Sequence, residues 1–157
     1  MNALNDTLSL QRGPINSLYA SGPYWDATRE KRLVIQYCVQ SGQYQFYPRP
    51  VSIATGHYEP EWREVSGNGE VYSYSITRSG PGPFRSITPY VVAIIRLNEG
   101  VDILSNIVNL GSSSLEIGLR VKPYWLPLDD GRHLLMFEPD LMSEADLDAN
   151  RLDQIRE

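Results

Sequence analysis

The sequence predicts a mainly β protein, and three candidate strands within residues 69–108 carry that prediction. Residues 71–77 alternate large apolar residues with serine and threonine, as in a half-buried strand. Residues 90–97 then form a nearly continuous apolar run. The turn Asn98-Glu99-Gly100 predicts a hairpin with residues 101–108, because glycine supplies the positive φ. Three strands with an apolar face can nucleate a sheet, so we expect this meander to be the core of the fold.

Length and composition favour one main domain with small appendages. The chain has 157 residues, enough to bury about 70% of the surface of its unfolded form. Its net charge of −5 disfavours a general nucleic-acid binder, since phosphate backbones attract basic surfaces. The single cysteine, Cys38, excludes an intramolecular disulfide and fits a reducing compartment. No window approaches the ~20 apolar residues of a membrane-spanning helix, so we expect a cytoplasmic protein without a membrane partner.

The N-terminal part is expected to hold a tail and two short helical pieces. Gly22 and Pro23 break the amphipathic stretch of residues 15–32 into these two pieces. Proline fits the first turn of a helix, so Pro23 predicts a helix of about two turns that ends near Arg32.

Aromatic and basic side chains follow in this second helical piece. Tyr24 and Trp25 either anchor the helix on the sheet or contact a ligand. Arg29, Lys31 and Arg32 form either a solvated helix end, near the negative pole of the helix dipole, or a handle for a phosphorylated ligand.

The next segment has the outline of a small ribbon. Short strands are predicted at residues 33–37 and 43–46. Four positions have the spacing x2, x10, x2 of two knuckles that face each other in a zinc ribbon. They are Cys38, Ser41, Ser52 and Thr55, and only the first is cysteine.

Two further strands follow the meander. Residues 79–89 are rich in glycine and proline and predict a long loop that is neither helix nor strand. Residues 112–118 predict a short helical or turn-like connection to a fourth strand at residues 119–125. The turn Asp129-Asp130-Gly131 predicts a hairpin with a fifth strand at residues 133–137. Five strands with a connection after the third match an OB-fold barrel.

The end of the chain predicts a short amphipathic helix. Ser143 and Asp146 give a start signal, and an apolar stripe follows it. This helix either packs on its own barrel or docks in a groove of a partner. The predicted parts of the chain are the tail and short helices at residues 1–33, the ribbon at 34–65, the OB-fold domain at 66–140 and the C-terminal helix or tail at 141–157.

Most of the chain, residues 18–139, resembles the acyl-CoA-associated OB-fold family. Members of that family carry an N-terminal helical segment, a rubredoxin-like zinc ribbon and a C-terminal OB-fold domain. Four motifs together make the match strong. They are Phe46-Tyr47-Pro48-Arg49-Pro50, Ser66-Gly67-Asn68-Gly69, Pro89-Tyr90-Val91-Val92-Ala93 and Leu104-Ser105-Asn106.

The ribbon departs from that family at its zinc ligands. The hydroxyls of Ser41, Ser52 and Thr55 are poor ligands for zinc, which prefers thiolates and imidazoles. Cys38 and His57 cannot form a four-ligand site by themselves. We therefore expect no zinc and no other cofactor, with the shape of the ribbon kept by packing.

The sequence contains no complete catalytic constellation. His57 and His133 are the candidate bases, and neither lies in a known motif. There is no nucleophile elbow, glycine-rich phosphate loop or His-Glu-x-x-His helix. Asp129 and Asp130 are expected to form the turn rather than an acid and base pair. A non-catalytic role is therefore favoured, and a small CoA-ester hydrolase or hydratase is an alternative.

The resemblance implies an accessory subunit. Members of the family bind thiolase-like enzymes, including acyltransferases and lipid-transfer-type aldolases, and help to build their substrate channel. We expect this chain to bind such an enzyme and to help shape its acyl-CoA site. The alternative is an OB-fold binder of nucleotides or single-stranded nucleic acid, which acidic residues in the loop between the last two strands oppose.

The predicted binding residues are aromatic and basic. We expect a cleft between ribbon and barrel, lined by Tyr47 and Arg49 on one side and by Phe84 and Arg85 on the other. The alternative is that Arg49 only pairs with a carboxylate and that Phe84 only caps the barrel. The full set of predicted acyl-CoA or partner-binding residues is Tyr24, Trp25, Arg29, Arg32, Tyr47, Arg49, Phe84 and Arg85.

Overall fold

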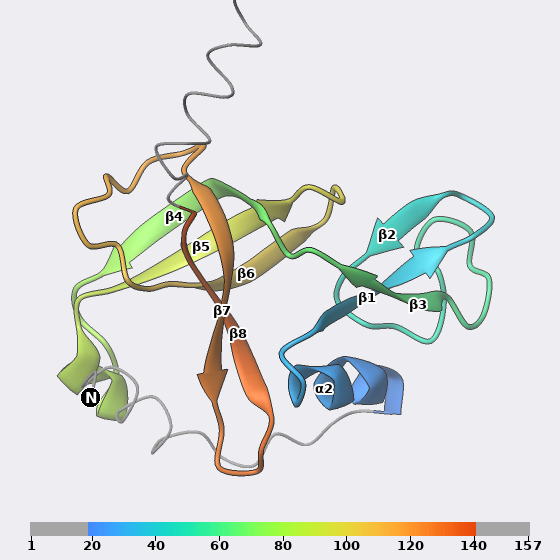
Figure 1. The fold of residues 1–157 in the computed structure, drawn as a ribbon, viewed down its shortest axis with the longest axis horizontal. Helices are drawn as coiled ribbons and strands as arrows, with labels where there is room; N and C mark the ends of the chain where they lie inside the picture. Colours follow the sequence, from blue (N-terminus) through green and yellow to red (C-terminus); the bar gives the residue numbers. More distant parts are fainter. Residues whose placement is uncertain (1–18, 141–157) are drawn as a thin grey trace, which may run out of the picture.

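The computed structural model describes residues 19–140, which form a barrel with a smaller sheet beside it (Figure 1). Two short helices come first, η1 (Tyr19–Ser21) and α2 (Gly22–Thr28). The smaller sheet contains β1 (Leu33–Cys38), β2 (Gln43–Gln45) and β3 (Glu61–Val65). The barrel contains β4 (Gly69–Thr77), β5 (Tyr90–Leu97), β6 (Asp102–Ile107), β7 (Arg120–Pro127) and β8 (His133–Pro139), with the helix η2 (Gly82–Ile87) between its first two strands. No helix within residues 19–140 is long and apolar enough to cross a membrane, and the predicted C-terminal helix lies outside the described residues.

Five strands close the barrel in the order β4-β5-β6-β8-β7. Strands β4, β5 and β6 are the antiparallel meander that the sequence predicts. Strand β8 lies parallel to β6, with Ile107 opposite Phe137. Strand β7 closes the barrel by pairing with the start of β4, where Gly69 lies opposite Val121. The predicted OB-fold is confirmed by this strand order and closure.

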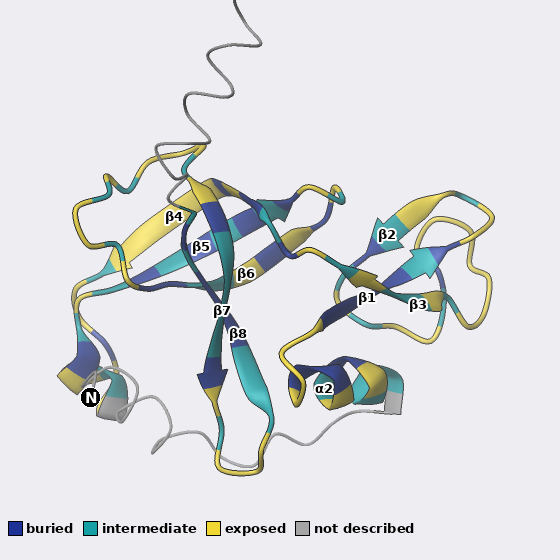
Figure 2. Ribbon diagram, in the orientation of Figure 1, coloured by how far each residue is buried: buried dark blue, intermediate teal, exposed yellow. Residues whose placement is uncertain are grey.

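Strand β5 shows how the barrel is filled. Its side chains alternate between buried and half-buried positions, and the buried ones are Val91, Ala93, Ile95 and Leu97. They pack in one cluster with Phe137 of β8 and with Leu33 and Ile35 of β1. The barrel and the smaller sheet therefore share a single apolar core, visible as the buried parts of their strands in Figure 2.

Two glycines allow the chain to pass from the smaller sheet into the barrel. Gly67 has a φ of +72°, and a Cβ there would overlap the ring of Pro123. A Cβ at Gly69 would overlap the backbone carbonyl of Arg96 on the neighbouring strand. The motif Ser66-Gly67-Asn68-Gly69 is thus explained by a left-handed turn followed by a close approach of two backbones.

The predicted loop between the first two barrel strands is wrong in one respect. Residues 82–87 form the 3-10 helix η2, with a proline in its first turn, where a missing N–H costs no helical hydrogen bond. Phe84 and Ile87 pack in a second apolar cluster with Leu126 and Met136 of the last hairpin. Glycine and proline in this segment therefore mark the start of a helix that covers one end of the barrel.

Three other elements differ in smaller ways from the prediction. Strand β3 was not predicted, and it pairs antiparallel with β1, so that the smaller sheet has the order β2-β1-β3. Helix α2 ends at Thr28, four residues before the predicted end at Arg32, and a turn follows it. Residues 111–118 form turns without a helix, which confirms the turn-like alternative for that connection.

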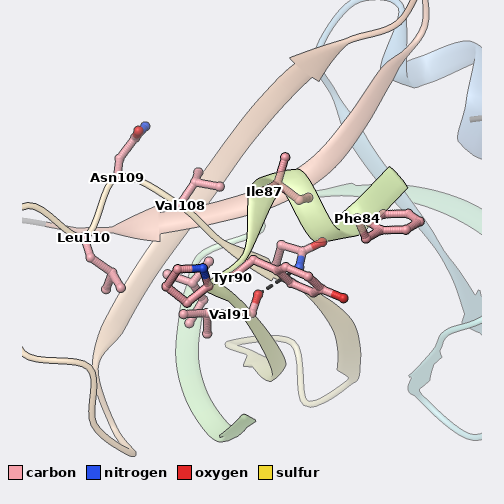
Figure 3. Close-up of a pocket in the computed structure, with 10 residues that line it drawn as sticks. Phe84, Ile87, Tyr90, Val91, Val108, Asn109 and Leu110 are labelled. Atoms are coloured by element: carbon pink, nitrogen blue, oxygen red, sulfur yellow. Dashed lines mark hydrogen bonds between the residues drawn. The ribbon is translucent and has the colours of Figure 1, made fainter. Parts of the chain in front are cut away.

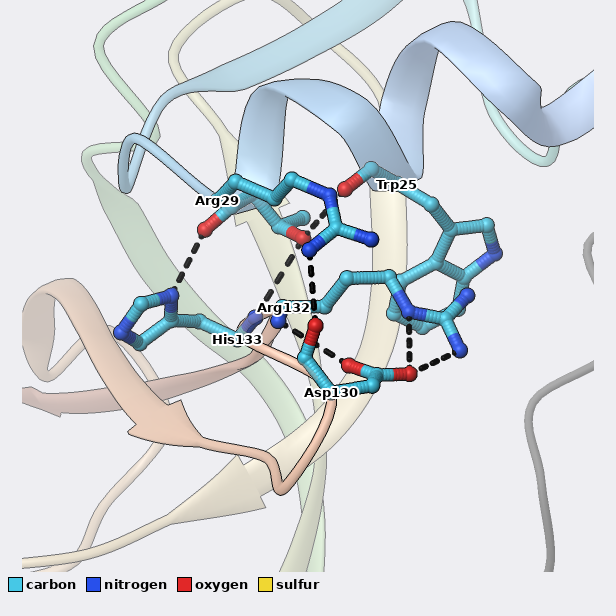
Figure 4. A network of polar contacts seen from close by, with 6 residues as sticks. Trp25, Arg29, Asp130, Arg132 and His133 are labelled. Carbon is cyan, nitrogen blue, oxygen red and sulfur yellow. Dashed lines mark hydrogen bonds and ion pairs between the residues drawn. The ribbon is translucent and has the colours of Figure 1, made fainter.

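Hydrogen bonds join α2 to the β7–β8 hairpin (Figure 4). Thr28 is completely buried, and its Oγ1 donates to the Trp25 carbonyl oxygen over 2.7 Å. The backbone N–H of His133 donates to Thr28 Oγ1, and His133 Nδ1 lies 2.8 Å from the Thr28 carbonyl oxygen. Arg29 Nη1 donates to the Asp130 carbonyl oxygen over 2.7 Å. The helix is therefore held to the tip of the hairpin at three points.

We predict that Thr28→Val destabilises the protein. Valine keeps the volume of threonine but removes the hydroxyl, so the Trp25 carbonyl and the His133 N–H lose a partner in a buried place. The expected loss is about 1–3 kcal/mol of the free energy of unfolding, measured by urea denaturation. The exposed Ser112→Ala is the control and should change stability little. Equal stability of the two variants would show that the buried hydroxyl does not hold the helix.

Candidate functional site

The ribbon brings its two predicted knuckles together. The first knuckle is closed by a hydrogen bond from Gly42 N–H to the Cys38 carbonyl, and the second by one from Gly56 N–H to the Ser52 carbonyl, both 2.8 Å long. Cys38 Sγ lies 3.5 Å from Thr55 Oγ1 of the second knuckle. The spacing x2, x10, x2 therefore corresponds to two turns that meet at one sulfur atom.

Hydroxyl groups surround that sulfur. The hydroxyls of Ser41, Ser52 and Thr55 favour the thiolate and lower the pKa of Cys38 to about 6, although burial of the side chain acts in the opposite direction. Ser52 Oγ also accepts hydrogen bonds from the N–H groups of Ala54 and Thr55, and Thr55 Oγ1 accepts one from His57. The knuckles are thus held by side-chain and backbone hydrogen bonds.

The chemistry of these donors does not fit a structural zinc ion. One thiol and three alcohol oxygens replace the four thiolate or imidazole ligands that such sites use. Two of the three oxygens already serve the backbone of the second knuckle. Within residues 19–140 no group of three or more His, Cys, Asp or Glu side chains is arranged to hold a metal.

Two buried glutamines hold the loop between the knuckles. Gln45 Nε2 donates to Gln36 Oε1 over 2.8 Å, and both side chains are almost fully buried. Gln36 also exchanges two hydrogen bonds with the backbone of Arg49, each 2.8 Å long. Gln45 bonds in addition to Val51 and Ile53. This network positions residues 46–53, and its only trace in the sequence is the polar Gln36 in an otherwise apolar strand.

A groove of about 340 Å³ lies where this loop meets the barrel, and we name it the ribbon–barrel groove. It is lined by Ser21, Tyr24, Trp25, Phe46, Tyr47, Pro48, Ile103, Leu104, Leu134 and Leu135. Two of these side chains remain largely open to solvent, Leu104 at 59% and Tyr47 at 51% exposure. An apolar groove with exposed aliphatic and aromatic side chains is typical of a binding surface.

Aromatic rings in edge-on and tilted contacts form one wall of the groove. The Tyr24 ring lies 5.0 Å from Trp25 and 5.8 Å from Phe46, and Phe46 lies 4.5 Å from Tyr47. Burial raises the pKa of the Tyr24 phenol well above its usual value, and the neighbouring Tyr47 adds to this. Arg132 covers Trp25, with its guanidinium carbon 5.2 Å from the ring centroid. The buried Tyr24 ring therefore packs behind Trp25 and Phe46, and Phe46 in turn contacts the exposed Tyr47.

The predicted cleft shared by Tyr47, Arg49, Phe84 and Arg85 is wrong. Phe84 lines a separate pocket of about 320 Å³, the η2 pocket, together with Ile87, Pro89, Tyr90, Val91 and residues 106–110 (Figure 3). The two cavities have no lining residue in common. In Figure 1, η2 lies beside the barrel away from the smaller sheet, because it folds back over the barrel end.

The predicted cations are dispersed. Arg32 is exposed and forms ion pairs with Glu30 at 2.9 Å and with Glu64 at 3.0 Å. Arg29 donates to the β7–β8 turn, as described above. Arg49 and Arg85 are exposed on different segments. Arg29 and Arg32 therefore do not form a common phosphate handle.

The sequence analysis missed two residues of the ribbon–barrel groove, Leu104 and Leu134. Leu104 had a usable signal, because it breaks the alternation of apolar and polar residues in its strand.

Neither candidate base is placed as in a catalytic dyad. His133 Nδ1 lies against the Thr28 carbonyl. His57 lines the same shallow cavity as Cys38, but its Nδ1 lies 3.4 Å from Gln40 Nε2. The neighbours of the Cys38 sulfur that shift its pKa are the three hydroxyls and the backbone of Ser41. The described chain therefore offers binding surfaces more clearly than a reaction centre.

A comparison with known proteins identifies the barrel as a known type of domain. The family model described as the C-terminal OB-fold domain of ChsH2 matches residues 62–126. The probable enoyl-CoA hydratase alpha subunit of Thermomonospora curvata is 32% identical over 132 residues, which are 83% of this chain and 41% of that subunit. A DUF35 domain-containing scaffold protein of Methanothermobacter thermautotrophicus is 36% identical over 87 residues, 54% of this chain and 65% of that protein. This chain thus spans less than two thirds of the length of either relative.

A solved structure extends the similarity to the N-terminal part. A chain of the Ltp2-ChsH2(DUF35) aldolase superposes with a TM-score of 0.70 and 32% identity. The match covers 83% of this chain and 100% of that chain. A DUF35 protein of Sulfolobus solfataricus, with a TM-score of 0.58 and 14% identity, shows the same fold. With the fold, the motifs and the full coverage of a relative in agreement, the chain belongs to the acyl-CoA-associated OB-fold family of DUF35 proteins.

Proposed function

We propose that this chain is a non-catalytic accessory subunit that binds a thiolase-like acyltransferase or aldolase and helps to shape its acyl-CoA substrate site. The names of three similar proteins support a role beside an enzyme: a DUF35 domain-containing scaffold protein, the Ltp2-ChsH2(DUF35) aldolase and a probable enoyl-CoA hydratase alpha subunit. The thiolase-like partner comes from the resemblance of the sequence motifs to the family.

The observation that carries the proposal is the ribbon–barrel groove. Its exposed Tyr47 and Leu104 stand beside Trp25, which is half-buried and held by Arg132. Binding energy at protein interfaces concentrates in a few aromatic and apolar anchors that fill pockets. A standard interface buries about 800 Å² on each partner, and we propose that the helix, ribbon loop and barrel strands that line the groove supply this surface.

The η2 pocket is proposed to take the apolar part of the acyl-CoA. Its lining is mostly aliphatic and aromatic, with Phe84 and Tyr90 rings 6.3 Å apart. Its volume of about 320 Å³ falls within the usual range for small-molecule sites. Arg85, the exposed residue that follows Phe84 in η2, is the proposed contact for the phosphates of the CoA.

We predict that Leu104→Asp abolishes binding of the partner enzyme without unfolding the chain. The side chain is exposed, so the variant should fold, but a carboxylate in the groove would be buried without a partner in the complex. A candidate thiolase-type enzyme is co-expressed with this chain and captured through it. We expect at least about a tenfold loss of captured enzyme, and a parallel loss of enzyme activity.

The matched control is Ile117→Asp. Ile117 is also an exposed aliphatic residue, at 71% exposure, and it lies outside the groove in the connection before β7. This variant should retain the partner. Equal capture by both variants would reject the groove as the interface. Full activity of the enzyme alone, without co-purification of this chain, would reject the accessory role.

We also propose that the ribbon holds no zinc, because its donor set is one thiol and three hydroxyls. Elemental analysis of protein purified without chelators should give far less than one zinc per chain. A strong chelator should leave the thermal unfolding temperature unchanged, unlike in domains whose fold depends on zinc. One tightly bound equivalent of zinc per chain would contradict the proposal.

The state of Cys38 predicts a pH dependence of stability. Its pKa is about 6 in the folded chain and about 8.5 in an unfolded chain, so the unfolded state binds more protons between these values. The free energy of unfolding should therefore rise with pH over this interval, and the contribution should be lost as the pH falls through 6. Cys38→Ser should remove this rise in urea denaturation, whereas His57→Gln should keep it. An unchanged pH profile for Cys38→Ser would show that the thiolate is not stabilised.

A further inference from the structure

Strand β4 has two edges, and one of them is covered over only part of its length. On one side β4 pairs with β5 from Gly69 to Thr77. On the other side it pairs with β7 at Gly69 and Glu70, and Val71 adds backbone hydrogen bonds of 2.9 and 2.8 Å to the residues before β7. Within residues 19–140, no strand covers this second edge at residues 72–77. Backbone N–H and C=O groups on such an edge can pair with a strand of another molecule.

Beyond its first residue, the uncovered stretch lacks the features that usually protect an edge. Residues 72–76 are all exposed, as the colour of β4 in Figure 2 shows. The exposed fractions of Tyr72, Tyr74 and Ile76 are 47%, 38% and 39%. Residues 72–77 contain no charged residue, proline or glycine, although edges normally carry at least one of these or a bulge. The one register shift of the strand lies between Val71 and Ser73, where the uncovered stretch begins, and Ser73 to Thr77 pair with β5 without a further shift.

We propose that this edge of β4 pairs with the same edge of a second copy of this chain. In an antiparallel pair centred on Ser75, Tyr74 of each copy lies opposite Ile76 of the other, and Ser73 lies opposite Thr77. Pairs of aromatic with β-branched residues, and of hydroxyl residues with each other, stabilise neighbouring strands. The stretch is therefore complementary to itself, and it joins two barrels through one continuous sheet.

The charges that flank the stretch select this antiparallel arrangement. Glu70 lies before the uncovered edge and Arg78 lies after it. Antiparallel pairing places Arg78 of one copy opposite Tyr72 of the other and toward its Glu70. Parallel pairing would place equal charges side by side, which is unfavourable. A two-fold pair covers the uncovered β4 edge of each copy at once, so no such edge remains for a third copy and assembly stops at a dimer.

The test places a charge on the two-fold axis. Ser75 is exposed in the single chain, so Ser75→Lys and Ser75→Glu should fold, which circular dichroism verifies. Sedimentation velocity of the full chain over a range of concentrations should show a dimer for the wild type. Each variant should dissociate at concentrations at least about tenfold higher than the wild type, because equal charges meet at the axis. An equimolar mixture of the two variants should restore the dimer, since lysine then meets glutamate.

Ser112→Lys is the matched control, because it adds the same charge to an exposed turn away from β4. It should leave the dimer intact. A wild type that stays monomeric over the whole range would overturn the proposal, even if Ser75→Lys weakened capture of a partner enzyme. A dimer that persists in Ser75→Lys, or a mixture that fails to associate, would equally overturn it.

Discussion

The structure depends on the packing of the N-terminal segment into the core of the barrel. Leu33 and Ile35 of β1 and Tyr24 of α2 are buried in the same cluster as Val71 and Phe137 of the barrel. Burying these side chains in the barrel cluster removes further apolar surface from water and so stabilises both parts. The same contacts fix the position of the ribbon. The ribbon–barrel groove is therefore as well defined as the core itself, although it lies between two separately formed sheets.

Side-chain hydrogen bonds hold the loop of the ribbon in place. A buried amide is costly unless all its polar atoms are paired, and the Gln36–Gln45 network pairs them with backbone groups of the loop. The knuckle hydroxyls do the same for the second turn. The loop that carries Tyr47 thus keeps its shape through local polar contacts. These hydrogen bonds involve no thiolate, so the two knuckle turns are compatible with a single cysteine.

The barrel could be predicted from the sequence because each of its strands has a local signal. The apolar run of β5 and the Asp-Gly turn before β8 specify elements without reference to distant residues. The groove and η2 could not be predicted from local signals, because they depend on contacts between segments that are far apart in the sequence. Phe84 has the composition of a loop residue in its context, but it packs on Leu126 and Met136, more than 40 positions later. Leu104 breaks the alternation of its strand, but only the placement of α2 and the ribbon loop beside it shows which groove it lines.

The distribution of covered and uncovered surfaces also separates two roles on one small barrel. The groove uses β6 and β8 together with α2 and the ribbon loop. The uncovered edge belongs to β4, and β5 stands between β4 and β6 in the barrel. No residue is common to the groove and the edge. Because the helix and ribbon cover only one side of the barrel, an enzyme seated in the groove would leave the β4 edge of the same chain accessible to a second copy.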